Sequence, residues 1–147
     1  MRAMCNASDL EMTNLCTQLR QFWGTVGLTA GVKMTKDTFI HGINRLAQDE
    51  LERKRKGEIT LHEQLNNAFF DVMDINKDGT VSIDELKIMM KACNMDPSGA
   101  ENWFNAADYN KNGIIEREEL NKYEFDFWFR PELEENSELF GGAYSGR

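Results

Sequence analysis

The chain has 147 residues, of which 41% are hydrophobic and 29% charged, and its formal net charge is −8 at pH 7. This length and apolar content suffice for one compact domain but not for two independent cores. The acidic balance argues against nucleic acid and anionic membranes as partners, because the main basic run, Arg53-Lys54-Arg55-Lys56, is typical of a solvated helix end. No stretch approaches the ~18 apolar residues of a membrane span.

Helix start signals recur along the chain. Ser8, Thr60 and Ser82 each stand three residues before a glutamate, the pattern of a capping box. Asp96 is followed by a proline suited to a first helical turn. Together with apolar periodicity, these signals predict an all-α fold with helices at 9–25, 36–56, 61–73, 83–94, 97–107 and 117–129.

Two polar loops, 74–85 and 108–119, match the 12-residue EF-hand calcium loop. Such a loop wraps a hard cation with side-chain and main-chain oxygens, turns at a glycine in position six and ends in a bidentate glutamate. Gly79 and Gly113 occupy position six. The predicted ligand residues are Asp74, Asn76, Asp78, Thr80, Ser82 and Glu85 in the first loop, and Asp108, Asn110, Asn112, Ile114, Glu116 and Glu119 in the second.

An ordinary polar turn is the alternative, because Asp, Asn and Gly dominate turns. Two complete matches, each closed by glutamate, favour two Ca²⁺ sites, with Mg²⁺ expected as a competitor. Each site has three carboxylates, which leaves a charge of about −1 around a divalent ion. At position eight stand Val81 and Ile115, β-branched residues suited to an extended segment where the loops pair.

A third, degenerate copy lies upstream. Aromatic pairs precede both loops, at Phe69-Phe70 and Trp103-Phe104, and Phe22-Trp23 repeats the pattern. The segment 27–38 has the right length but lacks the ligands, the turn glycine and the closing glutamate. We therefore expect a non-binding EF-hand at 9–56; a plain helical hairpin is the alternative.

The prediction is a single EF-hand domain over 1–147. Its parts are the degenerate hand 9–56, the active hands 61–94 and 97–129, which form one paired unit, and a C-terminal tail 130–147. Leu139 and Phe140 are expected to fold back onto the body.

The active doublet, the inactive hand, Phe127-Trp128-Phe129 and Leu139-Phe140-Gly141 together resemble the group of sarcoplasmic calcium-binding proteins, calexcitin and coelenterazine (luciferin)-binding proteins. The resemblance implies an enclosed ligand cavity and a further N-terminal EF-hand, which residues 1–14 are too short to supply. Three explanations stay open: a shortened isoform, a homodimer through the unpaired hand, or a first helix that fills the gap.

The main functional hypothesis is a soluble, cytoplasmic calcium buffer or sensor. A sensor would expose a Met-rich groove for a target protein or helix, and the candidates are Met73, Met89, Met90 and Met95, although Met at helical spacing also fills cores. The second hypothesis, from the resemblance, is a calcium-regulated carrier of a small apolar ligand such as a luciferin. Its candidate cavity residues are Trp23, Phe39, Phe69, Trp103, Tyr123 and Trp128.

An enzyme is not expected. The two histidines, His41 and His62, lie in helix patterns without a nucleophile motif, and no glycine-rich phosphate loop occurs. The cysteines Cys5, Cys16 and Cys93 lack metal spacing and fit reduced thiols.

Overall fold

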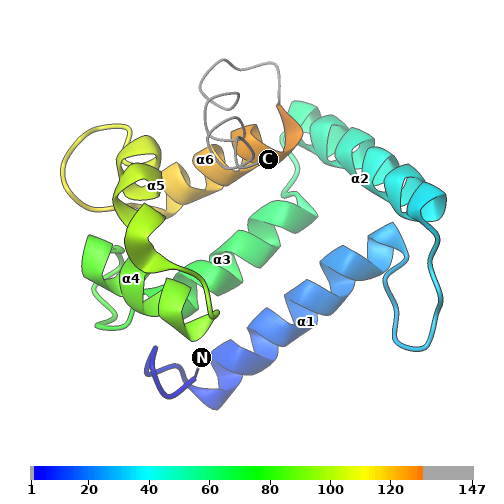
Figure 1. Cartoon of the computed structure of the whole chain (residues 1–147). Helices are drawn as coiled ribbons and strands as arrows, with labels where there is room; N and C mark the ends of the chain where they lie inside the picture. The colour runs from blue at the N-terminus through cyan, green and yellow to red at the C-terminus, as the bar shows by residue number, and fades with distance from the viewer. Residues whose placement is uncertain (1, 131–147) are drawn as a thin grey trace.

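The computed structural model describes residues 2–130, and within them the fold is all-α, as predicted. The helices, shown in Figure 1, are α1 (Asp9–Val26), α2 (Lys36–Lys56), α3 (Leu61–Met73), α4 (Ile83–Ala92), the 3₁₀ turn η1 (Pro97–Gly99), α5 (Ala100–Ala107) and α6 (Arg117–Phe129). The predicted folding back of Leu139 and Phe140, and nearly all of the predicted tail, lie outside the described residues.

Three of the predicted helices differ at their ends, and of these α1 is longer by one residue, ending at Val26. The helix predicted at 97–107 begins as the 3₁₀ turn η1, whose start is capped by Asp96, and becomes α-helical only at Ala100. α4 ends at Ala92, earlier than the predicted 94, because Asn94 adopts a left-handed backbone with φ of 59° that a helix cannot continue through.

The start of α3 is capped from another helix. Thr60 accepts a hydrogen bond from Glu63 N at 2.9 Å, which is one half of the predicted capping box; the reciprocal bond to the Glu63 side chain does not form. The next donors, Leu61 N and His62 N, are bound at 3.0 and 2.9 Å by the two carboxylate oxygens of Glu50 in α2. Glu50 is completely buried, so its charge is stabilised by these donors and by the positive end of the α3 dipole.

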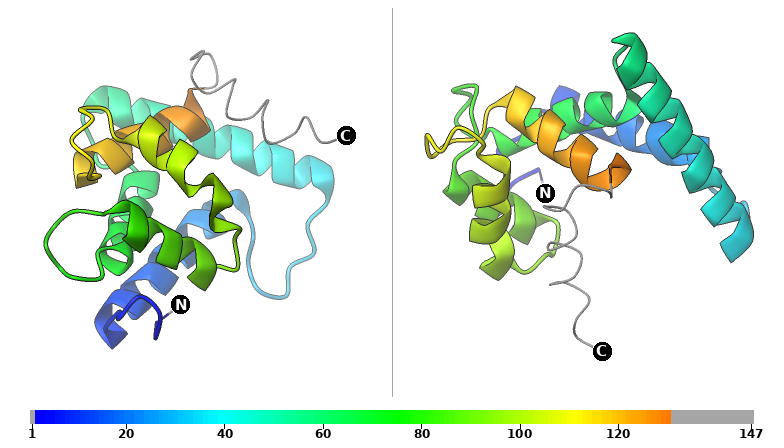
Figure 2. Two further views of the ribbon diagram at one scale, coloured as in Figure 1. Left: turned by 60° about the vertical axis from the view of Figure 1, so that its left-hand side comes forward. Right: turned by 90° about the horizontal axis from the view of Figure 1, so that it is seen from above.

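α1 and α2 form the upstream helical hairpin and cross at close range. A Cβ on Gly42 would lie 2.2 Å from the backbone oxygen of Val26, so only glycine lets the helices approach this far. Arg45 adds a hydrogen bond from its Nη2 to Thr25 O at 2.8 Å. Figure 2 shows α2 crossing the end of α1 and extending past the rest of the molecule. This is the helix–loop–helix shape predicted for the degenerate hand.

α1 also lies along α3, as both Figure 1 and Figure 2 show. Leu15 and Phe22 on α1 are buried, and the ring of Phe22 lies 5.8 Å from that of His62 on α3. Ahead of α1, Cys5 is fully buried, with its Sγ 3.8 Å from Met89 Sδ on α4. The first helix and the segment before it therefore cover one side of the paired hands.

Candidate metal centre and ligand cavity

The two predicted calcium loops lie back to back. Val81 N donates to Ile115 O at 2.9 Å and Ile115 N donates to Val81 O at 2.8 Å, which forms an isolated antiparallel bridge. Both side chains are 1% exposed, so position eight of each loop is anchored in the core. The loops are joined as one unit, as the sequence predicts.

In the first loop, Asp74 organises the turn. Its two carboxylate oxygens accept from Asp78 N at 3.1 Å and Gly79 N at 2.9 Å. Asp78 in turn accepts from Thr80 N and from the Thr80 hydroxyl, and Asn76 Nδ2 donates to its other oxygen at 2.8 Å. These hydrogen bonds, that of the Thr80 hydroxyl first, lower the pKa of Asp78, so it stays ionised and ready for a cation.

Glu85 closes the same loop from the first turn of α4. Its Oε1 accepts from Ile75 N at 3.0 Å and Asn76 N at 3.2 Å, and its Oε2 accepts from Ser82 N at 2.9 Å. The side chain thus reaches back across the loop to its beginning. This is the reach that position twelve requires.

The second loop repeats this network. Asp108 accepts from Asn112 N at 3.2 Å and Gly113 N at 3.0 Å, and Asn112 Oδ1 accepts from Ile114 N at 3.1 Å. The turn needs a left-handed backbone at Gly113, where φ is 83°. The amide side chain at position five replaces the Asp of the first loop and still accepts from the backbone N–H two residues ahead.

Glu119 closes the second loop as Glu85 closes the first. Its Oε1 accepts from Asn110 N at 3.2 Å and its Oε2 from Glu116 N at 3.0 Å. Both predicted ligand sets are therefore brought together by contiguous chain. Their roles as metal ligands stay a prediction, which the donor chemistry below supports.

Four carboxylates of the loops are buried: Asp74, Glu85, Asp108 and Glu119, with 4 to 8% of their surface exposed. Among residues 2–130, none of them forms an ion pair with a lysine or arginine. Buried charges of one sign without a counter-charge are costly, so these sites fit a divalent cation.

The lysines of the loops point away from these acids. Lys77 Nζ bonds Glu11 Oε1 on α1 at 2.6 Å, and Lys111 Nζ donates to Asn105 O. Within residues 2–130, no three His, Cys, Asp or Glu side chains converge closely enough to hold a metal by themselves. Amide, hydroxyl and main-chain oxygens are needed to complete either site, which is the donor set of Ca²⁺ and Mg²⁺ rather than of a transition metal.

A second feature is an apolar cavity of about 520 Å³ lined by residues of all six α-helices. It has the size and lining typical of a small-molecule site. The lining residues are Leu19, Phe22, Trp23, Ile43, Leu46, Ala47, His62, Leu65, Asn66, Phe69, Met73, Leu86, Met89, Met90, Cys93, Met95, Trp103, Leu120, Glu124, Trp128 and Phe129.

The cavity wall adjoins both loops in sequence. Met73 directly precedes Asp74, Leu86 directly follows Glu85, and the second loop is followed at once by the lining residue Leu120. A change in the position of the closing glutamates would therefore move the cavity wall.

Three polar side chains interrupt the apolar lining. His62 on α3 is 4% exposed, and burial lowers its pKa to about 4, so it is neutral at pH 7. Its Nδ1 lies 3.3 Å from Asn66 Nδ2. Glu124 on α6 accepts from Trp128 Nε1 at 3.0 Å, and burial raises the pKa of its carboxyl to about 7.

The structure both supports and corrects the predicted cavity residues. Trp23, Phe69, Trp103 and Trp128 line the cavity, but Phe39 and Tyr123 do not. Phe39 is 37% exposed because it lies in the first turn of α2, ahead of Gly42, where α2 approaches α1. Tyr123 is buried, with its ring at 5.3 Å from that of the lining residue Trp103, and burial raises its pKa.

The predicted Met-rich groove is also part of the cavity. Met73, Met89, Met90 and Met95 all line it, and only Met95 is largely exposed. The sequence reading missed Glu124. A signal was present, since an acid four residues before Trp128 on an aromatic helix shares its face, but helical spacing alone does not tell which face is enclosed.

Comparisons with known proteins agree with the two loops. The EF-hand domain pair model matches residues 62–123, which contain both loops. Aequorin-2 of Aequorea victoria is 31% identical over 151 residues, which cover 93% of this chain and 76% of aequorin-2. Luciferin-binding protein of Renilla reniformis is 31% identical over 107 residues, which cover 71% of this chain and 55% of that protein.

A solved relative is the light-sensitive photoprotein berovin of the ctenophore Beroe abyssicola, in its Ca²⁺-loaded apoprotein state. It superposes with a TM-score of 0.79 and 35% identity, over 86% of this chain and 70% of berovin. All three calcium-binding loops of berovin also bind magnesium ions.

Proposed function

The chain belongs to the EF-hand family of aequorin and luciferin-binding protein, and from that membership we propose that it binds a luciferin-like aromatic molecule in its cavity under the control of calcium. The resemblance to luciferin-binding EF-hand proteins is confirmed. The likeness to sarcoplasmic proteins and calexcitin stays a prediction, and so does the cytoplasmic location.

The observation that carries the proposal is the junction of cavity and loops. Each closing glutamate is followed by a leucine of the cavity wall, and each glutamate caps the first turn of the helix that holds this leucine. When bound, Ca²⁺ supplies a divalent charge that competes with the backbone N–H groups for these carboxylates. Any resulting shift of α4 or α6 is transmitted to the cavity, because both helices are packed into its wall.

The same cavity favours a carrier over the buffer or sensor hypothesis. A sensor needs an apolar groove open to a target helix, whereas the four methionines share one cavity with all three tryptophans of the chain, and Met73 and Met89 are buried. The role proposed is binding without turnover. Two calcium sites and Mg²⁺ competition are part of the proposal, and the magnesium-binding loops of berovin support the latter.

Ligand-dependent quenching of tryptophan fluorescence tests the proposal. Coelenterazine is titrated into the protein with calcium and with chelator, and quenching should saturate with an affinity that differs between the two conditions. Glu85→Gln and Glu119→Gln should each reduce this difference. Glu118→Gln is the matched control, because Glu118 is exposed beside Glu119 and has no ligand position. If saturable quenching occurs neither with calcium nor with chelator, the proposal is refuted.

A further inference from the structure

We propose that Glu124 selects the ligand: its carboxyl binds a hydrogen-bond donor, a phenolic O–H or a ring N–H, on an aromatic molecule in the cavity. This inference rests on the proposed ligand-binding function and names the chemical class that the site prefers. It follows from where the carboxyl lies, how it is held, and which other polar groups share the cavity.

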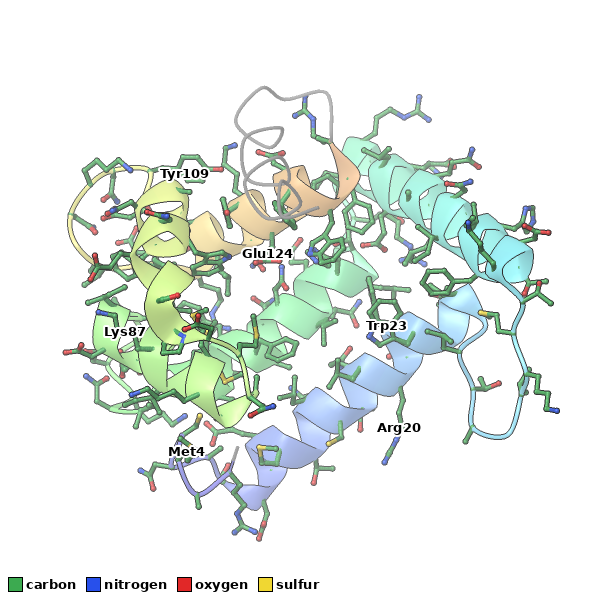
Figure 3. The ribbon with its side chains drawn as sticks, in the orientation of Figure 1. Met4, Arg20, Trp23, Lys87, Tyr109 and Glu124 are labelled. Carbon is green, nitrogen blue, oxygen red and sulfur yellow. The ribbon has the colours of Figure 1, made fainter. Side chains whose placement is uncertain are left out.

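The carboxyl is held in place by an aromatic residue of the cavity. Glu124 Oε2 accepts from Trp128 Nε1 at 3.0 Å, one helical turn further along α6. Trp128 and, on α5, Trp103 both line the cavity. Figure 3 shows Glu124 between α6 and α3, and its side chain is partly buried. The indole of Trp128 thus orients the carboxyl before a ligand arrives.

No cation neutralises Glu124 within residues 2–130. The nearest basic residue in sequence, Lys122, bonds Asp126 Oδ2 at 2.6 Å on another face of α6. Desolvation accordingly raises the pKa of Glu124 to about 7, against the opposing effect of the hydrogen bond from the Trp128 indole. Any additional hydrogen-bond donor that reaches Glu124 therefore stabilises its ionised form.

The other titratable groups of the cavity do not compete for this role. His62 is neutral and its Nδ1 is already bonded to Asn66, and burial raises the pKa of the Cys93 thiol. Glu124 is the single carboxyl of the lining. An aromatic ligand with a donor satisfies the carboxyl, while an isosteric ligand without one leaves it desolvated and unpaired, which is the basis of strong discrimination.

Equilibrium dialysis with a matched pair of probes tests this inference. The probes are 2-naphthol, which carries an O–H donor, and 2-methoxynaphthalene, which does not. At pH 8 the wild type should prefer 2-naphthol by about tenfold or more. Glu124→Leu should lose that preference while keeping affinity for the methoxy probe, and the isosteric Glu124→Gln should reduce the preference in a side chain of the same shape.

Glu118→Leu, on the exposed side of the same helix, is the control and should keep the wild-type preference. If the wild type binds both probes equally, or Glu124→Gln keeps the full preference, the role of Glu124 is refuted while the cavity function stands. If neither probe binds the wild type, the proposed ligand-binding function fails together with the inference.

Discussion

Acid should destabilise this protein through His62, and the size of the effect can be worked out. Burial lowers the pKa of His62 from 6.5 to about 4. The unfolded chain therefore binds a proton that the folded chain excludes, so stability falls as pH drops below 6.5 and levels off below about 4. Since one pKa unit corresponds to about 1.4 kcal/mol, the full loss is about 3 kcal/mol, of which about 2.5 kcal/mol is reached at pH 4.5.

The perturbation is His62→Gln, which keeps a polar side chain beside Asn66 but cannot titrate. Urea unfolding of both proteins in chelator, followed by tryptophan fluorescence, gives the free energy of unfolding at pH 7.5 and at pH 4.5. The free energy of unfolding of the variant minus that of the wild type should be about 2.5 kcal/mol larger at pH 4.5 than at pH 7.5. The carboxylates are common to both proteins, so their contributions to the pH dependence cancel in this difference. A difference that does not change with pH would refute a neutral, buried His62.

Three further outcomes are expected. Calorimetric titration should find two calcium sites in the wild type and one effective site in each of Glu85→Gln and Glu119→Gln. A third stoichiometric site would refute the prediction that the hand at 9–56 does not bind calcium. Gly42→Ala should lower the free energy of unfolding by at least about 1–3 kcal/mol, because the added Cβ would lie 2.2 Å from a backbone oxygen of α1. Gly24→Ala is the control: a Cβ on Gly24 meets no atom within 4 Å, so this substitution should not destabilise the protein. Glu50→Ala should cost about 1–3 kcal/mol by leaving the first two N–H groups of α3 unpaired, and a change below ~0.5 kcal/mol in denaturant unfolding would contradict this capping role.

The shape of the two loops could be predicted because each is built from contiguous residues. Asp74 bonds backbone groups four and five residues ahead, and Glu85 reaches back nine and ten. The geometry of such a loop depends on local spacing and on one glycine turn, so the sequence is sufficient. Most helix spans could be predicted for the same reason: caps and apolar periodicity depend on residues within one or two helical turns.

The cap on α3 shows the limit of such reasoning. Thr60 and Glu63 carry a local signal, and the bond between them forms. The carboxylate that completes the cap comes from Glu50, on a different helix, and nothing in the spacing of α2 distinguishes it from its exposed neighbours.

The amino-acid sequence by itself determined the helices and the turns of the two loops, because hydrogen bonds between near neighbours set these features. The β-branched residues at position eight predicted the pairing of Val81 with Ile115. Only the tertiary structure decided which residues line the cavity, why Phe39 lies outside it, and how His62 and Glu124 acquire pKa values far from the ordinary. The physical reason is that burial and desolvation depend on how helices distant in sequence cross, here on the approach of α2 to α1 at Gly42 and the packing of α1 along α3.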